Sequence, residues 1–227
     1  MDDNSIILDS LIKSLGASKT GFAYVEDVVP ADKKSLKSAV TVMVRLSDSI
    51  IDEISDKPTH TYFHHYRSVN FLIDQITLRC VLLLQEWGYK AFAVPASQTV
   101  KTKQDNYTAV FQHKTAATRA GLGWIGKNGL LVTPEYGPRV RMGTVLTDME
   151  LPYGQPITES KCGQCRLCVT NCPAMALHGT IWEAGIPREK MVDANACSVY
   201  MHDRFRDIGR GSVCGICMRV CPFGSKF

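Results

Sequence analysis

The chain has 227 residues, of which 45% are hydrophobic and 21% charged, a composition typical of a soluble globular protein with a hydrophobic core. No apolar run reaches the ~18 residues that span a bilayer, and the acidic start Met1-Asp2-Asp3 lacks the basic region of an export signal. We therefore expect a cytoplasmic protein without a membrane partner. A formal charge of +4 is too small to indicate broad nucleic-acid binding.

The first 150 residues alternate between helical and strand-like patterns. Apolar spacing predicts helices over residues 5–15, 59–87 and 107–120, and strands over 20–25, 39–46, 90–94, 130–133 and 140–147. The longest helix carries one apolar stripe, on which Cys80 is interpreted as a buried core thiol. This alternation predicts an α/β class, an α+β sandwich over residues 1–150, followed by a cysteine-rich domain over 151–227.

Eight of the nine cysteines lie in two copies of one spacing pattern. The first copy is Cys162-x2-Cys165-x2-Cys168-x3-Cys172-Pro173, the run of bacterial-type ferredoxins. The second copy is partly opened: Cys197 precedes Cys214-x2-Cys217-x3-Cys221-Pro222. In a cytosolic protein such spacing favours metal binding over disulfides.

In two-cluster ferredoxins the fourth cysteine of each run binds the other cluster. The spacing therefore predicts two [4Fe–4S] clusters with crossed ligands. One set is Cys162, Cys165, Cys168 and Cys221, and the other is Cys172, Cys197, Cys214 and Cys217. A pair of zinc sites is the alternative, but zinc ribbons seldom repeat the x2-x2-x3 pattern before proline. Such a ferredoxin-like module would take single electrons from a low-potential donor of the ferredoxin or flavodoxin type.

A glycine-rich segment, residues 121–129, precedes the strand at 130–133. Four of its nine residues are glycine, namely Gly121, Gly123, Gly126 and Gly129. Such a backbone either turns sharply, permitting tight packing of a helix on a strand, or offers N–H groups to a ligand. The residues alone leave these two interpretations open.

This segment, with residues 130–131, the run 143–148 and the double cysteine motif, resembles the epoxyqueuosine reductases over roughly residues 60–227. That family is cobalamin-dependent and related to the reductive dehalogenases. The resemblance implies a bound cobalamin, reduced by the nearer cluster, although a flavin remains an alternative. It places the corrin near a set of nine residues: Gly121, Gly123, Gly126, Lys127, Asn128, Leu131, Arg141, Met142 and Gly143.

Three departures from the family pattern bear on the substrate. The family's upstream aspartate falls on Tyr107 and its following glutamate on His113, and the chain ends at Phe227 without the helical extension by which longer members grip tRNA. These departures argue against epoxyqueuosine in tRNA as the substrate and against tRNA binding. Tyr107 is the proposed proton donor, as in reductive dehalogenases, against the simpler role of a packing aromatic. Asp105 and His113 are the other candidates.

The sequence thus predicts an iron–sulfur oxidoreductase in which two clusters pass electrons to a cobalamin that reduces a small or nucleoside-like molecule. Two other roles stay open. One is a non-catalytic electron carrier or reductive activator for a corrinoid or other partner, and the other is a trafficking protein that reduces cobalamin for handover. Binding of a corrinoid and turnover of a small substrate would separate the three.

Overall fold

The computed structural model describes residues 3–97 and 107–224. They divide into two compact units. The sheet unit comprises Met1–Arg45, Val69–Leu122 and Arg141–Ile157, and the cysteine unit comprises Leu46–Ser68, Gly123–Val140 and Thr158–Phe227. This division differs from a single boundary at residue 150, because residues 46–68 and 123–140 belong with the cysteine-rich segment.

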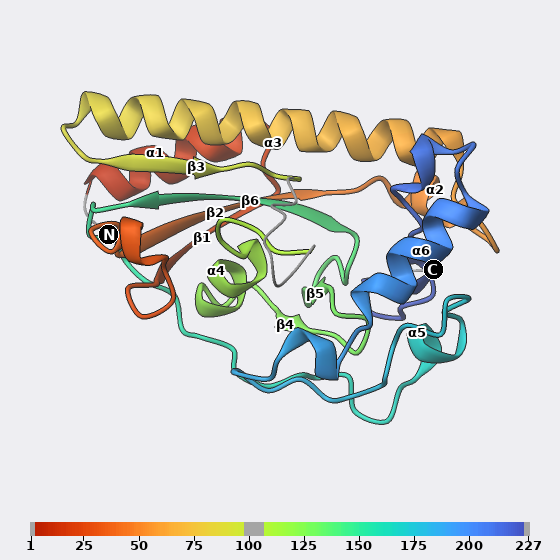
Figure 1. The fold of residues 1–227 in the computed structure, drawn as a ribbon. Coiled ribbons are helices and arrows are strands. Elements are labelled where there is room, and N and C mark those ends of the chain that lie inside the picture. The colour runs from red at the N-terminus through yellow and green to blue at the C-terminus, as the bar shows by residue number, and fades with distance from the viewer. Residues whose placement is uncertain (1–2, 98–106, 225–227) are drawn as a thin grey trace. The chain divides into compact units, whose positions relative to one another are not determined.

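The sheet unit is built on four strands in the order β1-β2-β6-β3 (Figure 1). They are β1 (Lys19–Tyr24), β2 (Ser38–Arg45), β3 (Ala91–Val94) and β6 (Val140–Thr147). β1 pairs antiparallel with β2, and β3 pairs antiparallel with β6. Seven of the eight residues of β2 are buried, which explains its nearly continuous apolar sequence. All four strands were predicted from sequence, with ends within one or two residues.

Helices cover both faces of this sheet. Figure 1 shows α1 (Asp3–Ser14) and α3 (His60–Glu86) on one face and α4 (His113–Arg119) on the other, with the short turn η1 (Ala31–Lys33) between β1 and β2. This confirms the predicted α/β sandwich. The stripe on α3 is buried as expected, including Val69, Ile73, Ile76 and Cys80, all at most 7% exposed. Burial raises the pKa of the Cys80 thiol to about 12, as suits a core residue.

Helix α3 is long and apolar enough to cross a membrane by length and composition alone. The core helix of a soluble protein passes the same test. In the sheet unit, a methyl group at Gly143 of β6 would lie 2.4 Å from Ile73 of α3, so the apolar face of this helix is packed against the sheet.

The predicted helix over residues 107–120 is wrong in its first half. Helix α4 begins only at His113, after Gln112, whose backbone is extended at φ −92° and ψ 110°. Phe111 is 4% exposed and buries its ring while the chain around it is not helical. Apolar spacing at Tyr107, Val110 and Phe111 imitates a helix, but burial of Phe111 by tertiary packing decides the local backbone.

The cysteine unit contains short elements. They are α2 (Asp48–Asp52), β4 (Trp124–Ile125), β5 (Leu131–Val132), α5 (Leu167–Thr170), η2 (Arg188–Lys190), α6 (Ala194–Arg204), η3 (Gly209–Gly211) and α7 (Ile216–Arg219). β4 and β5 pair antiparallel, so the glycine-rich segment forms the turn of a small hairpin. The buried guanidinium of Arg139 binds Asp48 at 3.2 Å and Asp52 at 2.8 Å, which ties α2 to the chain after the hairpin.

Candidate functional site

Four cysteines from both copies of the motif line one small cavity in the cysteine unit. Cys162, Cys165, Cys168 and Cys221 surround about 20 Å³ of space, together with Pro222 and Phe223. Cys168 lies on α5, and Cys221 follows α7 by two residues. The fold thus brings together the set that crossed ligation predicts, although Cys221 is far from the other three in sequence.

The remaining four cysteines form a second group. Burial is the main cause of a raised pKa at Cys197, which reaches about 11, and at Cys214 and Cys217. Repulsion from neighbouring thiolates is a further cause, and the groups responsible include Cys172 in all three cases. These effects link Cys172 with Cys197, Cys214 and Cys217, as the predicted second ligand set requires, and Cys168 of the first group also acts on Cys217.

The chemistry of these two donor sets fits two iron–sulfur clusters. Burial also raises the pKa of Cys221 to about 11 and that of Cys168, with neighbouring thiolates adding to both shifts. These shifts favour the neutral thiol at Cys168 and Cys221. Iron binds cysteine as the thiolate, so cluster assembly would release protons. The individual ligand assignments remain predictions.

Two polar side chains of the glycine-rich segment hold the two cysteine loops. The Lys127 ammonium donates hydrogen bonds to the carbonyl oxygens of Gly163, at 2.7 Å, and Cys165, at 3.0 Å. The Asn128 amide donates to the carbonyl oxygen of Cys217 at 3.3 Å, and its own oxygen accepts from the backbone N–H of Leu130. Both side chains are at most 6% exposed. The segment therefore supports the first cysteine copy through Lys127 and the second through Asn128.

Close packing accounts for the glycines that the family resemblance assigned to a corrin. A Cβ atom at Gly121 would lie 2.6 Å from the carbonyl oxygen of Gln155, and one at Gly123 would lie 2.3 Å from that of Val132. A Cβ at Gly126 would lie 2.7 Å from the side-chain oxygen of Asn128. Gly121 and Gly123 thus face backbone carbonyls, whereas Gly126 also lines the cavity of the first cysteine group.

The other residues of the predicted corrin set are also engaged. The Arg141 guanidinium donates to Asn70 at 2.9 Å and to the carbonyl oxygen of Ala96 at 3.4 Å. Leu131 is 2% exposed, and Met142 is half-buried on β6. A Cβ atom at Gly143 would lie 2.4 Å from Ile73. The assignment of these residues to cobalamin stays a prediction.

A pocket of about 170 Å³ lies beside His113 in the sheet unit. It is lined by Val94, Pro95, Ala96, Ser97, Ala109, Val110 and His113. The imidazole Nε2 lies 3.0 Å from the carbonyl oxygen of Pro95 and Nδ1 lies 2.8 Å from the hydroxyl of Thr144. Because a carbonyl only accepts, Nε2 carries the proton and Nδ1 accepts from Thr144. Burial lowers the pKa of His113, so the ring is held neutral with both nitrogens occupied, which argues against a general acid.

The two other candidate proton donors are placed differently. Tyr107 is half-buried in a bend before α4 and is not among the residues that line the pocket beside His113. Asp105 lies outside the described residues. The role of Tyr107 in catalysis therefore stays a prediction.

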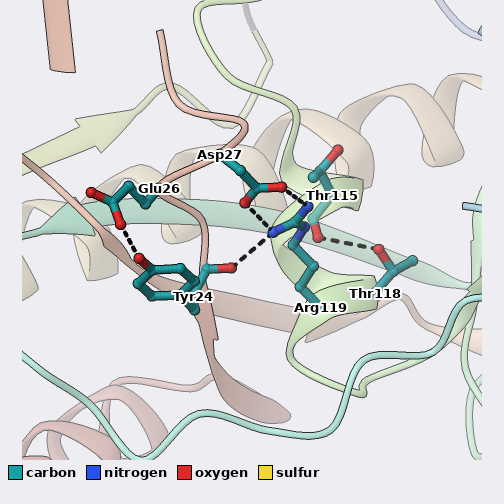
Figure 2. A network of polar contacts seen from close by, with 6 residues as sticks. All are labelled: Tyr24, Glu26, Asp27, Thr115, Thr118 and Arg119. Carbon is teal, nitrogen blue, oxygen red and sulfur yellow. Dashed lines mark hydrogen bonds and ion pairs between the residues drawn. The ribbon is translucent and has the colours of Figure 1, made fainter. Parts of the chain in front are cut away.

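A polar network fixes α4 in the sheet unit. Figure 2 shows the Arg119 guanidinium against the carboxylate of Asp27, with both oxygens bound at 2.6 Å, while it also donates to the carbonyl oxygen of Tyr24. The hydrogen bonds from Arg119 lower the pKa of Asp27. The Tyr24 hydroxyl in turn donates to Glu26. These contacts anchor the end of the helix that begins at His113.

Sequence reasoning missed several residues around the first cysteine group. Val132, Pro222 and Phe223 line the cavity, and the ring of Phe223 contacts that of Trp124 edge-on at 5.0 Å between centroids. The Cys-Pro pair was the available signal for Pro222. Nothing in the local sequence indicates the partners of Lys127, because Gly163 is 36 residues away.

Comparison with known proteins bears on both units. Residues 161–224 match the 4Fe–4S double cluster binding domain. The epoxyqueuosine reductase of Synechocystis is 33% identical over 152 residues, which cover 61% of this chain and 49% of that protein. The epoxyqueuosine reductase of Bacillus anthracis is 30% identical over 142 residues, which cover 59% of this chain and 35% of that protein. The chain thus spans about half or less of the length of these relatives.

Solved structures share the fold. A catabolic reductive dehalogenase in complex with 3-bromo-4-hydroxybenzoic acid superimposes with a TM-score of 0.71 at 21% identity, covering 96% of this chain and 31% of the other. The epoxyqueuosine reductase of Streptococcus thermophilus gives a TM-score of 0.64 at 18% identity, covering 98% and 66%. The chain is therefore an iron–sulfur relative of the epoxyqueuosine reductases, with the fold that they share with reductive dehalogenases and a 4Fe–4S double cluster domain over residues 161–224.

Proposed function

We propose that this protein is a reductase in which two [4Fe–4S] clusters deliver single electrons to an organic acceptor, for which the family resemblance implies cobalamin. The first cluster is assigned to Cys162, Cys165, Cys168 and Cys221, and the second to Cys172, Cys197, Cys214 and Cys217. The observation that carries the proposal is that thiols from both copies of the cysteine motif line the same cavity. A ferredoxin or flavodoxin is the proposed electron donor.

When bound, such clusters supply reversible one-electron transfer at potentials set by charge, hydrogen bonding and exposure. The protein's own groups supply the rest. The eight thiols lose their protons to become ligands, and Lys127 and Asn128 fix the backbone of the two cysteine loops. Because these two side chains are buried and hydrogen-bonded, they hold the loops in place during the change of charge.

The substrate is proposed to be a small organic or nucleoside-like molecule, and epoxyqueuosine in tRNA belongs among the candidates. The expectation that excluded it rested on Tyr107, His113 and the chain end. The curated relatives are epoxyqueuosine reductases, and one structural neighbour is such an enzyme with an epoxyqueuosine-modified tRNA stem loop. These relatives give no support to the exclusion of epoxyqueuosine as a substrate, nor to the expectation that the protein does not bind tRNA.

The test begins with anaerobic purification and measurement of iron, sulfide and zinc. Titration with cob(II)alamin follows, monitored by EPR. Two clusters per chain and a protein-bound cobalt signal support the proposal, and reduction of epoxyqueuosine-containing tRNA or of a small organic substrate would then identify the reaction. Two clusters with an unchanged cobalt signal would overturn the cobalamin assignment in favour of a flavin enzyme or an electron carrier. Zinc in place of iron would overturn the proposal as a whole.

A further inference from the structure

Lys127 places a buried positive charge at the wall of the first cysteine cavity. Lys127 is 4% exposed, and it lines the same cavity as Cys162, Cys165, Cys168 and Cys221. Within the part of the chain that the structure describes, its hydrogen-bond partners are the carbonyl oxygens of Gly163 and Cys165, and no carboxylate pairs with it. The charge is therefore not neutralised locally.

The second cysteine group has a different electrostatic setting. The equivalent polar contact from the glycine-rich segment comes from Asn128, a neutral amide, through the carbonyl oxygen of Cys217. Asp193, the N-cap of α6, contributes a negative charge that acts on Cys197. The two groups thus have charges of opposite sign beside them, one buried and one exposed.

Reduction adds one negative charge to a cluster, so a nearby positive charge stabilises the reduced form. Solvent and salt screen an exposed charge strongly and a buried one much less. Lys127 therefore acts on the potential of this cluster more than an exposed lysine beside the same cysteines does. Lys161 is such a residue: it immediately precedes Cys162 and is exposed.

We propose that Lys127 raises the reduction potential of the cluster bound by Cys162, Cys165, Cys168 and Cys221. An electron shared by the two clusters would therefore reside mainly on this cluster. The inference depends on the cluster ligation proposed above. It adds an order to the two clusters: the group that includes Cys197 passes the electron, and the group beside Lys127 holds it.

The experiment is an EPR-monitored redox titration of the anaerobic holoprotein in four forms: wild type, Lys127→Gln, Lys127→Arg and Lys161→Gln. In Lys127→Gln we expect one midpoint to fall by at least a tenfold change in the reduction equilibrium, which is about 59 mV for one electron. The other midpoint stays in place. Lys127→Arg keeps the charge and remains near wild type, and Lys161→Gln does the same because its charge is exposed. A Cys221→Ser variant identifies the midpoint of the first cluster.

Three results would overturn the inference. The first is an unchanged pair of midpoints in Lys127→Gln, and the second is an equal shift of both. The third is loss of one cluster's iron in Lys127→Gln but not in Lys127→Arg, which would assign Lys127 to loop stability alone. Failure of the ligation itself is distinguishable, because wild-type protein would then contain zinc, or fewer than about eight iron atoms per chain.

Discussion

Replacement of Gly143 by alanine separates a packing role of this residue from a role in cofactor binding. Gly143 lies in β6, and a Cβ atom there would lie 2.4 Å from Cγ2 of Ile73 and 2.9 Å from Cγ2 of Thr77. Both neighbours are on α3 and at most 1% exposed, so they have little room to move. Helix and sheet would have to shift apart.

The expected change in the free energy of unfolding of Gly143→Ala is the balance of two opposing effects. Overpacking of a dense core by one methyl group costs about 1–3 kcal/mol. Alanine recovers about 0.4–1 kcal/mol by restricting the unfolded chain, since Gly143 is not among the glycines with positive φ. The net loss is about 1–2 kcal/mol, and each kcal/mol lowers Tm by about 2–4 °C in a protein of this size.

The assay is unfolding of the holoprotein under anaerobic conditions, for Gly143→Ala, Ile73→Ala and the double variant. Ile73→Ala alone costs about 2–5 kcal/mol because it leaves a cavity. In the double variant the methyl group at position 143 has room, so the total loss should be about 1–2 kcal/mol less than the sum of the single losses. Iron content serves as the control, because the eight cysteines of the two motif copies belong to the other unit.

Two results would refute this reasoning. Wild-type stability of Gly143→Ala would show that β6 and α3 are not in close contact at this point. Additive losses would show that the methyl group does not meet Ile73. Unchanged stability together with weaker corrinoid binding would instead support the cofactor role that the family resemblance implies.

Three further predictions concern the other parts of the structure. Cys221→Ser should lower iron content and alter one cluster's EPR signal, whereas Cys80→Ser should lower Tm and leave the iron unchanged; equal iron loss in both would contradict the assignments. Burial lowers the folded-state pKa of His113, so its contribution to stability is complete above its ordinary value of 6.5 and is lost as pH falls through that value toward the folded pKa. His113→Gln should therefore unfold with a weaker pH dependence between pH 7 and 5, and an unchanged dependence would refute this. Arg119→Met should cost only about 0.2–1 kcal/mol, because its partner Asp27 is 61% exposed. As the pKa of Asp27 is lowered, that loss should be present above its ordinary value of 3.8 and disappear at lower pH, which acid titration of both proteins would test.

Regular patterns made most of the fold predictable. The stripe on α3 repeats every three or four residues over 27 residues, so its length and its buried face followed from spacing alone. The four strands of the sheet were equally clear. The prediction of a helix over residues 107–112 failed because a short apolar segment fits a helix and an extended chain alike, and burial of Phe111 decides between them.

The candidate site was predictable where contacts follow from a repeated motif. Spacing predicted that Cys221 lies beside Cys162, Cys165 and Cys168, because crossed ligation relates these residues without any knowledge of the fold, and the four line one cavity. The partners of Lys127 and Asn128 were not predictable, since they lie 36 and 89 residues away and are backbone carbonyls that carry no sequence signal. For the same reason, sequence could not decide whether the glycines face a ligand or a neighbouring strand.

Asn128 offers a test of whether the glycine-rich segment serves the iron–sulfur domain. Its amide donates to Cys217 at 3.3 Å, and its oxygen accepts from Leu130 at 3.1 Å, so Asn128→Ala removes one tertiary and one local hydrogen bond. Each bond contributes about 0.5–1.5 kcal/mol, and the buried groups left without partners add to the loss. Leu130→Ala is a neighbouring control, because its side chain contributes neither hydrogen bond.

The effect should be confined to the second cysteine group, which includes Cys217. We expect Asn128→Ala to lose iron faster than wild type or Leu130→Ala when a chelator is added, with the EPR signal of the second cluster disappearing first. The signal of the first cluster should persist, because Lys127 still holds Gly163 and Cys165. Equal loss of both signals would mean that the segment stabilises the cysteine unit as a whole. Weaker corrinoid binding with unaltered cluster lifetimes would mean that Asn128 serves the acceptor, and that its contact with Cys217 is incidental.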